Sequence, residues 1–158
     1  MSPERARELL AALPGVAVAA GDAQAPVVAP GLVVAHVPVE QWEAAARLAK
    51  DTLGCTFFSF STVIDWKGDG LEVIAWVDNL DANLSVQLRT RLGPGVTACP
   101  SLVPVYRGAD WMERECYDMF GVTFAGHPDP RRILLADDWE GHPLLKSYAV
   151  DTPYPPYR

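Results

Sequence analysis

The sequence predicts an α+β fold in which helices back a mixed or antiparallel β-sheet, with a long irregular segment at the carboxyl end. Near residue 55 the apolar positions change from a helical spacing to the dense β-branched and aromatic pattern of strands. A turn signal at 67–70 joins two such strands. The 12 glycines and 14 prolines among 158 residues favour a mixed fold with many turns over a helix bundle.

Residues 1–31 are expected to form a short surface helix and a flexible connector. Ser2 is a favourable N-cap, and Pro3 suits the first position of a helix. The stretch superficially resembles a secretory signal, but acidic residues in its charged part and a Pro-Gly pair in its apolar part argue against one. The small, nearly uncharged residues 14–31 are typical of a loose connector.

Residues 32–121 are expected to form the α+β domain. The apolar run 32–37 predicts a strand, and the helical pattern after it ends at Gly54. A hairpin and a third strand should follow, at 55–66, 71–77 and 83–92. A further short strand within 97–105 would be confined to a sheet edge by its two prolines.

The run RGADWMERECYDMFG, residues 107–121, predicts a second helix. Asp110 followed by Glu113 has the spacing of a capping box, which would start the helix at Trp111. Gly121 stands where a glycine commonly ends a helix. We expect the tryptophan to pack in the core or against the sheet.

Charged residues recur every four positions along this helix. Arg114 is therefore expected to form an exposed ion pair with Asp118. Glu113 and Asp118 could in principle act as an acid–base pair, but five residues apart on a helix they lie on different faces, which favours the ion pair. Cys116 falls on the apolar stripe and is expected to be a small buried residue.

Residues 122–158 are expected to form an extended segment that docks on a partner. Gly-His-Pro occurs twice, at 126–128 and 141–143, with an Arg-Arg pair and an acidic run between them. Prolines hold such segments extended, so their backbone groups must find hydrogen-bond partners on the domain or on another protein. Trp139 is the best candidate for an interface anchor.

The composition disfavours several classes of function. The net charge of −7 argues against a nucleic-acid backbone or an anionic membrane surface as the main partner. Glycine-rich nucleotide loops and cysteine pairs are absent from the sequence, as are apolar runs long enough to span a bilayer. A metal site from His127, His142 and Cys116 is conceivable, although neither histidine has helical ligand spacing.

The carboxyl-terminal third resembles a known family. The motifs WMERECYDMFG (111–121), GHPD (126–129), RRIL (131–134) and DWEGHPL (138–144) are similar to the signature of the 30-kDa, NuoC-type subunit of respiratory complex I, the NADH:quinone oxidoreductase. The match is dense over 110–148. The earlier helix and hairpin are compatible with the family's α+β domain but are not diagnostic.

The resemblance implies a non-catalytic structural subunit in the hydrophilic arm of a proton-translocating complex. Such a subunit packs against the quinone-site, 49-kDa-type subunit and near an iron–sulfur subunit, on the cytoplasmic side of the cell membrane. The chain itself would carry no cofactor or active site, and flavin and iron–sulfur clusters would belong to partner subunits. Contact with the membrane would be only through the complex, and nucleic acid is not an expected partner.

By position within the signature, the resemblance implies a set of structural and docking residues: Glu113, Arg114, Glu115, Asp118, His127, Arg131, Arg132, Trp139 and His142. Two alternatives remain open. The chain could be the equivalent subunit of a related ferredoxin-dependent or hydrogenase-type membrane complex. It could also be a stand-alone soluble enzyme that uses the carboxylates and histidines of this region.

Overall fold

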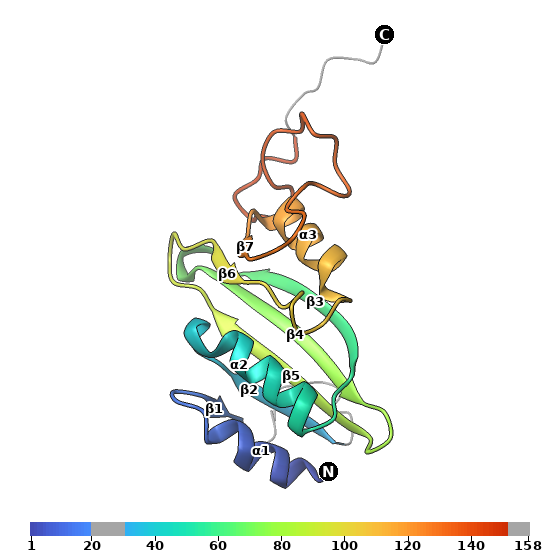
Figure 1. Ribbon diagram of the computed structural model, residues 1–158. Helices are drawn as coiled ribbons and strands as arrows, with labels where there is room; N and C mark the ends of the chain where they lie inside the picture. Colours follow the sequence, from blue (N-terminus) through green and yellow to red (C-terminus); the bar gives the residue numbers. More distant parts are fainter. Residues whose placement is uncertain (20–30, 152–158) are drawn as a thin grey trace.

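The computed structural model describes residues 1–19 and 31–151 and confirms the α+β class. Five strands form a mixed sheet in the order β1-β2-β5-β4-β3, and two short strands form a separate sheet (Figure 1). The strands are β1 (Ala17–Val18), β2 (Leu32–His36), β3 (Phe57–Asp65), β4 (Leu71–Asn79), β5 (Leu84–Arg91), β6 (Ala98–Pro100) and β7 (Thr123–Ala125). The helices are α1 (Pro3–Ala11), α2 (Trp42–Arg47) and α3 (Ala109–Phe120), with single turns η1 (Val39–Gln41), η2 (Leu48–Thr52) and η3 (Lys67–Asp69).

The pairing of the strands makes the sheet mixed. β3 and β4 form the expected antiparallel hairpin, which closes where Asp65 faces Leu71, and β4 pairs antiparallel with β5. β2 runs parallel to β5, with Leu32 opposite Ser85. A parallel pair needs a long crossover, which η1, α2 and η2 provide together with the hairpin.

Helices α1 and α2 cover one face of the large sheet, as Figure 1 shows. The predicted cap of α1 is confirmed, because the Ser2 hydroxyl accepts a hydrogen bond of 3.3 Å from the backbone N–H of Arg5. Leu10 from α1 and Trp42 from α2 are almost completely buried in the main core. Removal of this apolar surface from water is the principal favourable contribution to folding here.

Helix α3 packs against β3 at the other end of the molecule from α1 (Figure 1). The N–H of Ser61 on this edge strand points at the sulfur of Met112, 3.2 Å away, so the helix protects part of the open edge. The helix ends at Gly121, whose φ of 75° is left-handed as expected for a glycine cap. Cys116 is buried, as predicted.

The predicted start of this helix is wrong. It begins at Ala109 instead of Trp111, and its N-cap is Gly108 without a side-chain hydrogen bond. Glu113 does not form a capping box with Asp110, because its carboxyl group binds the segment before the helix. The contact of Glu113 with residues before the helix has therefore replaced the expected contact within its first turn.

The carboxyl-terminal region is less irregular than expected. Residues 98–100 form a strand in the range predicted, but their partner is β7, which lies inside the segment 122–158 and pairs with β6 in parallel. Residues 20–30 of the predicted connector and 152–158 of the predicted docking segment lie outside the described residues. Within residues 1–19 and 31–151, no helix is long and apolar enough to cross a membrane.

Candidate functional site

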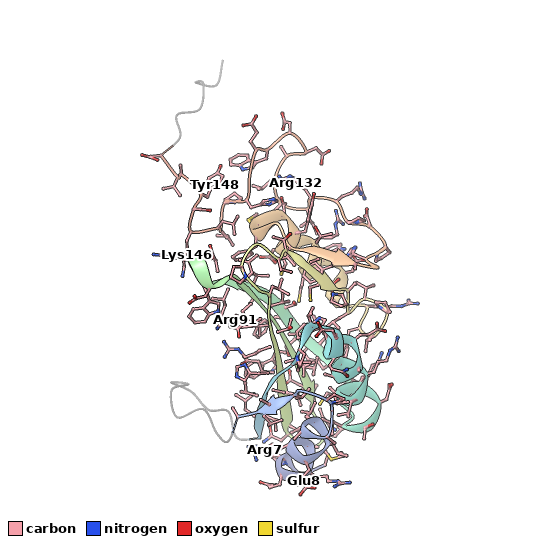
Figure 2. All side chains as sticks on the ribbon, turned by 90° about the vertical axis from the view of Figure 1, so that its left-hand side faces the viewer. Arg7, Glu8, Arg91, Arg132, Lys146 and Tyr148 are labelled. Atoms are coloured by element: carbon pink, nitrogen blue, oxygen red, sulfur yellow. The ribbon has the colours of Figure 1, made fainter. Side chains whose placement is uncertain are left out.

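Helix α3 brings the predicted site residues together with the segment that follows it. Figure 2 shows Arg132 at the end of the molecule opposite to Arg7 and Glu8. Of the nine predicted residues, Glu115 is exposed and Trp139 is half-buried. Hydrogen bonds within the chain involve the side chains of Glu113, Arg114, Asp118, His127, Arg131, Arg132 and His142.

Glu113 fixes the chain that leads into α3. Its side chain is buried and accepts hydrogen bonds of 2.6 Å from the hydroxyl of Ser101 and 2.6 Å from the N–H of Leu102. Burial raises the pKa of Glu113 to about 7, although both hydrogen bonds act in the opposite direction. This carboxyl group therefore titrates near neutral pH.

Asp118 is the attachment point for the next segment. It is fully buried, and one carboxylate oxygen accepts the N–H groups of Ile133, Leu134 and Leu135 at 3.1, 2.8 and 2.9 Å. Arg132 donates to the other oxygen at 2.6 Å. Burial alone would raise the pKa of Asp118, but the hydrogen bonds from Leu135, Leu134 and Arg132 outweigh it and hold the pKa below its ordinary value. The group is an ionised anchor.

Arg132 extends this attachment to a second part of the segment. The same guanidinium donates to the backbone carbonyls of Trp139 at 3.0 Å and Gly141 at 3.1 Å. The planar group with several donors is suited to joining a carboxylate to carbonyls. Arg132 therefore holds the loop 132–141 closed on itself and on Asp118.

The predicted ion pair between Arg114 and Asp118 is wrong. Arg114 donates instead to the backbone carbonyls of Arg131 at 3.0 Å and Arg132 at 2.9 Å, and its guanidinium lies 3.6 Å from Asp129. Asp118 is also not exposed. A buried carboxylate needs several donors, which one arginine on the same helix could not supply.

The two histidines have separate partners. Nε2 of His127 lies 3.0 Å from the carbonyl of Asp110 and 3.3 Å from its carboxylate, and Nδ1 accepts the N–H of Asp129 at 3.0 Å. His142 donates through Nδ1 to the carbonyl of Asp118 at 2.9 Å. In the described part of the chain, no three His, Cys, Asp or Glu residues are placed to hold a metal ion.

The ring of His142 packs on the end of α3. It lies against Gly121, where an added Cβ would come within 2.8 Å of the ring, and edge-on to Tyr117 with ring centroids 6.1 Å apart. The N–H of Leu144 donates to the carbonyl of Met119 at 3.0 Å. The carboxyl end of the helix is therefore covered by the segment that α3 anchors.

The exposed face of helix α3 carries an aromatic residue, Trp111, for which the sequence predicts a buried position. Trp111 does not pack in the core: 71% of its surface is exposed, beside a cavity of about 360 Å³ at the start of α3. Glu115 lies one turn further along and is also exposed. The signal that could have located Trp111 is the buried face of the helix, Ala109, Glu113 and Cys116, from which position 111 is turned away.

Comparison with known proteins identifies relatives of this chain. Residues 35–154 match the family described as "Respiratory-chain NADH dehydrogenase, 30 Kd subunit". The C subunit of the NADH-quinone oxidoreductase of Salinispora tropica is 37% identical over 125 residues, which cover 76% of this chain and 51% of that protein. The J subunit of the NAD(P)H-quinone oxidoreductase of Synechococcus sp. (strain RCC307) is 54% identical over 54 residues, which cover 34% of this chain and 31% of that protein. The chain spans about half the length, or less, of these curated relatives.

Solved structures share the fold. A chain from the membrane-bound sulfane sulfur reductase, an archaeal respiratory membrane complex, superposes with a TM-score of 0.73 at 21% identity, over 93% of this chain and 85% of that chain. The trypsin-resistant fragment of Nqo5 superposes with a TM-score of 0.61 at 20% identity, over 80% of this chain and 94% of that chain. At this identity the likeness concerns the fold alone.

The first prediction concerns the buried anchor. Asp118→Ala leaves Arg132 and three backbone N–H groups without their acceptor, so we expect a loss of about 3–5 kcal/mol in the free energy of unfolding. Urea unfolding measures the loss, and limited proteolysis should cut the variant within 131–142. Asp138→Ala, which removes an exposed carboxylate of the same segment, is the control and should leave the unfolding midpoint nearly unchanged. Equal effects of the two substitutions would contradict the anchor role.

The second prediction concerns pH. Folding raises the pKa of Glu113 to about 7, so the folded state binds more protons than the unfolded state and stability falls as pH rises through this window. Between pH 5 and pH 8 the loss from this group should be about 2–3 kcal/mol. Glu113→Gln, which cannot ionise, should lack that slope in urea unfolding series. Parallel slopes for the two proteins would refute the assignment.

The third prediction tests the contact between His142 and the end of α3. Gly121→Ala introduces both a left-handed alanine and a clash with the His142 ring, so it should destabilise the chain by about 1–3 kcal/mol. Gly126→Ala is a matched control, because its φ of 86° is also left-handed but a Cβ there meets nothing within 4 Å. The difference between their thermal midpoints reports the ring contact. No difference would mean that His142 does not pack as described.

Proposed function

This chain belongs to the family of the 30 Kd subunit of respiratory-chain NADH dehydrogenase, and on that premise we propose that it is a structural subunit in the hydrophilic arm of a proton-translocating NADH:quinone oxidoreductase. In this role it packs against the quinone-site, 49-kDa-type subunit and contacts an iron–sulfur subunit. The hydrophilic arm lies on the cytoplasmic side of the membrane, and this chain is a peripheral subunit that contacts the membrane only through the complex.

The observation that carries the proposal is the fixed surface at the carboxyl end. Asp118, Arg132 and Arg114 hold the segment 126–142 on α3 through charge-assisted hydrogen bonds. A surface fixed before binding loses little conformational entropy when it docks. Accurate placement of the quinone-site subunit is important because small displacements near a reacting centre lower rates by large factors.

The acidic residues of this region support a structural role over a catalytic one. Both carboxylate oxygens of Asp118 accept hydrogen bonds from internal donors, and Glu113 is buried against Ser101 and Leu102. A general acid or base must reach a substrate proton. In this proposal the chain has no active site, and the flavin and the iron–sulfur clusters belong to partner subunits.

A second candidate is the equivalent subunit of a related complex with another electron donor, such as a ferredoxin-dependent or hydrogenase-type membrane complex. A chain of the membrane-bound sulfane sulfur reductase, an archaeal respiratory membrane complex, has the same fold, so the fold is compatible with a complex of another activity. The docking role is the same in both cases. The set of subunits that co-purify with this chain from native membranes distinguishes them.

The fourth prediction tests docking through Trp111. Trp111→Ala should leave the thermal midpoint of the purified chain unchanged, because the ring is exposed. Loss of an aromatic anchor should weaken binding to the complex by about tenfold or more, measured as the yield of this chain in the complex after a salt wash. Leu80→Ala, with the same 71% exposure in the β4–β5 turn, is the control and should assemble normally.

One result would contradict the role of Trp111, and others would contradict the proposed function. Normal assembly of the Trp111→Ala chain would exclude this tryptophan as an anchor. Purification of the wild-type chain from native membranes without any other subunit, or turnover of a substrate by the chain alone, would exclude the structural role and favour the stand-alone enzyme.

A further inference from the structure

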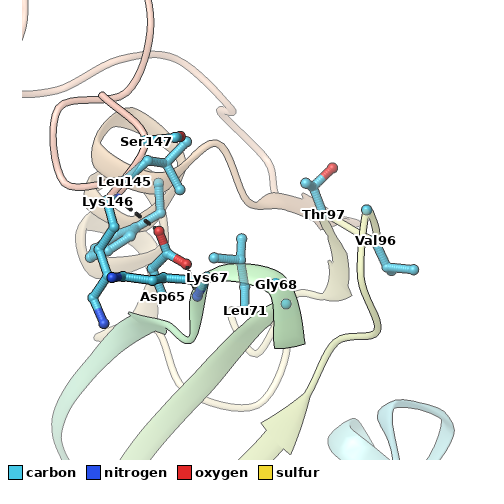
Figure 3. A pocket seen from close by; sticks show the side chains of 12 residues that line it. Asp65, Lys67, Gly68, Leu71, Val96, Thr97, Leu145, Lys146 and Ser147 are labelled. Carbon is cyan, nitrogen blue, oxygen red and sulfur yellow. Dashed lines mark hydrogen bonds between the residues drawn. The ribbon is translucent and has the colours of Figure 1, made fainter. Parts of the chain in front are cut away.

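A groove of about 670 Å³ lies between the β3–β4 turn, the loop before β6 and residues 145–147 (Figure 3). We call it the lysine groove. Its apolar lining includes Leu71, Val96, Phe120 and Leu145, and Lys67 and Lys146 border it. Figure 3 shows Val96 on one side and Leu145 and Lys146 on the other, with Leu71 between them. A volume of this size accommodates a drug-sized group or a few amino-acid side chains.

The groove gathers positive charge on an acidic chain. The chain has three lysines and a net charge of −7, and two of the three lysines border the groove. Among the residues that the structure describes, the ammonium groups of Lys67 and Lys146 form no hydrogen bond or ion pair. Asp65 binds their backbone N–H groups, at 2.7 Å and 2.8 Å. One carboxylate beside two ammonium groups leaves the groove with net positive charge.

The β3–β4 turn beside the groove has a residue order that its backbone conformation does not favour. Lys67 has a φ of 59°, a left-handed conformation that favours glycine over lysine. Its neighbour Gly68 is not left-handed, and a Cβ added to Gly68 would meet nothing within 4 Å. A glycine at 67 and an alanine at 68 would fit this turn with less strain. The observed order instead places the cationic side chain of Lys67 beside the groove and leaves open space at Gly68.

We propose that the lysine groove receives an extended segment of a partner subunit that carries an apolar side chain next to a carboxylate. The apolar side chain packs on Leu71, Val96 and Leu145, and the carboxylate lies between Lys67 and Lys146. An acidic segment is repelled by the net charge of this chain, so local charge complementarity fixes where it binds. The inference rests on the proposed function, because it assigns the occupant to another subunit of the complex.

The first test is zero-length cross-linking of the purified native complex. A carbodiimide joins an ammonium group to a carboxylate only where the two are in contact, and mass spectrometry identifies the joined peptides. We expect a link from Lys67 or Lys146 to an Asp or Glu of another subunit. Lys50 is the internal control: it donates to the carbonyl of Val105 and lies 5.3 Å from the ring centroid of Tyr106. A link only to residues 151–158 of this chain, or none, would overturn the proposal.

The second test is charge reversal in the complex. Lys67→Glu with Lys146→Glu should lower the yield of this chain in the salt-washed complex by about tenfold or more, while the purified variant keeps its thermal midpoint. Lys67→Arg with Lys146→Arg should retain the wild-type yield. Arg5→Glu with Arg47→Glu, which reverses two exposed cations on α1 and α2, is the matched control and should also assemble.

Different results would contradict the proposed function and the proposed occupant of the lysine groove. If the wild-type chain is absent from the complex, the proposed function is wrong. If the wild-type and the doubly reversed chains assemble equally and no cross-link reaches another subunit, the function stands and the lysine groove has no occupant from a partner.

Discussion

The carboxyl-terminal third of the chain depends on the burial of one carboxylate. Asp118 is fully shielded from water, and an ionised carboxylate in such a place is strongly unfavourable unless several donors reach it. Arg132 and three successive backbone N–H groups supply those donors from a segment more than ten residues along the chain. The segment gains its position from Asp118, and Asp118 can be buried only because the segment is in place.

Local signals in the sequence predicted those features that local interactions decide. The Ser2 cap, the hairpin over 67–70 and the glycine at 121 each depend on a few adjacent residues, and all three occur. The parallel pairing of β2 with β5 joins residues about fifty positions apart, which no short pattern encodes. The capping box failed for the same reason: Ser101 and Leu102, outside the helix, compete for Glu113 and bury it.

The candidate site shows a similar division. The signature that carries the family resemblance identified residues that are structurally important, but their spacing on the helix could not show which partners they choose. Arg114 and Asp118 are one turn apart, yet each binds the later segment instead of the other. Trp111 was predicted to be buried because an aromatic residue in a helix usually is. Only the positions of the buried residues of the helix reveal that Trp111 faces outward.

The lysine groove and the carboxyl-terminal surface that is fixed on α3 are connected through the same segment. Asp65 at the end of β3 binds the N–H of Lys146, and Leu145 donates to the carbonyl of His142, whose ring packs on the end of α3. One wall of the lysine groove is therefore made by chain that α3 holds in place, and the other by the β3–β4 turn and the loop before β6. A partner that binds the groove contacts both the sheet and the carboxyl-terminal segment. Its binding energy would stabilise their attachment, which links assembly of the complex to the order of the same residues that Asp118 anchors.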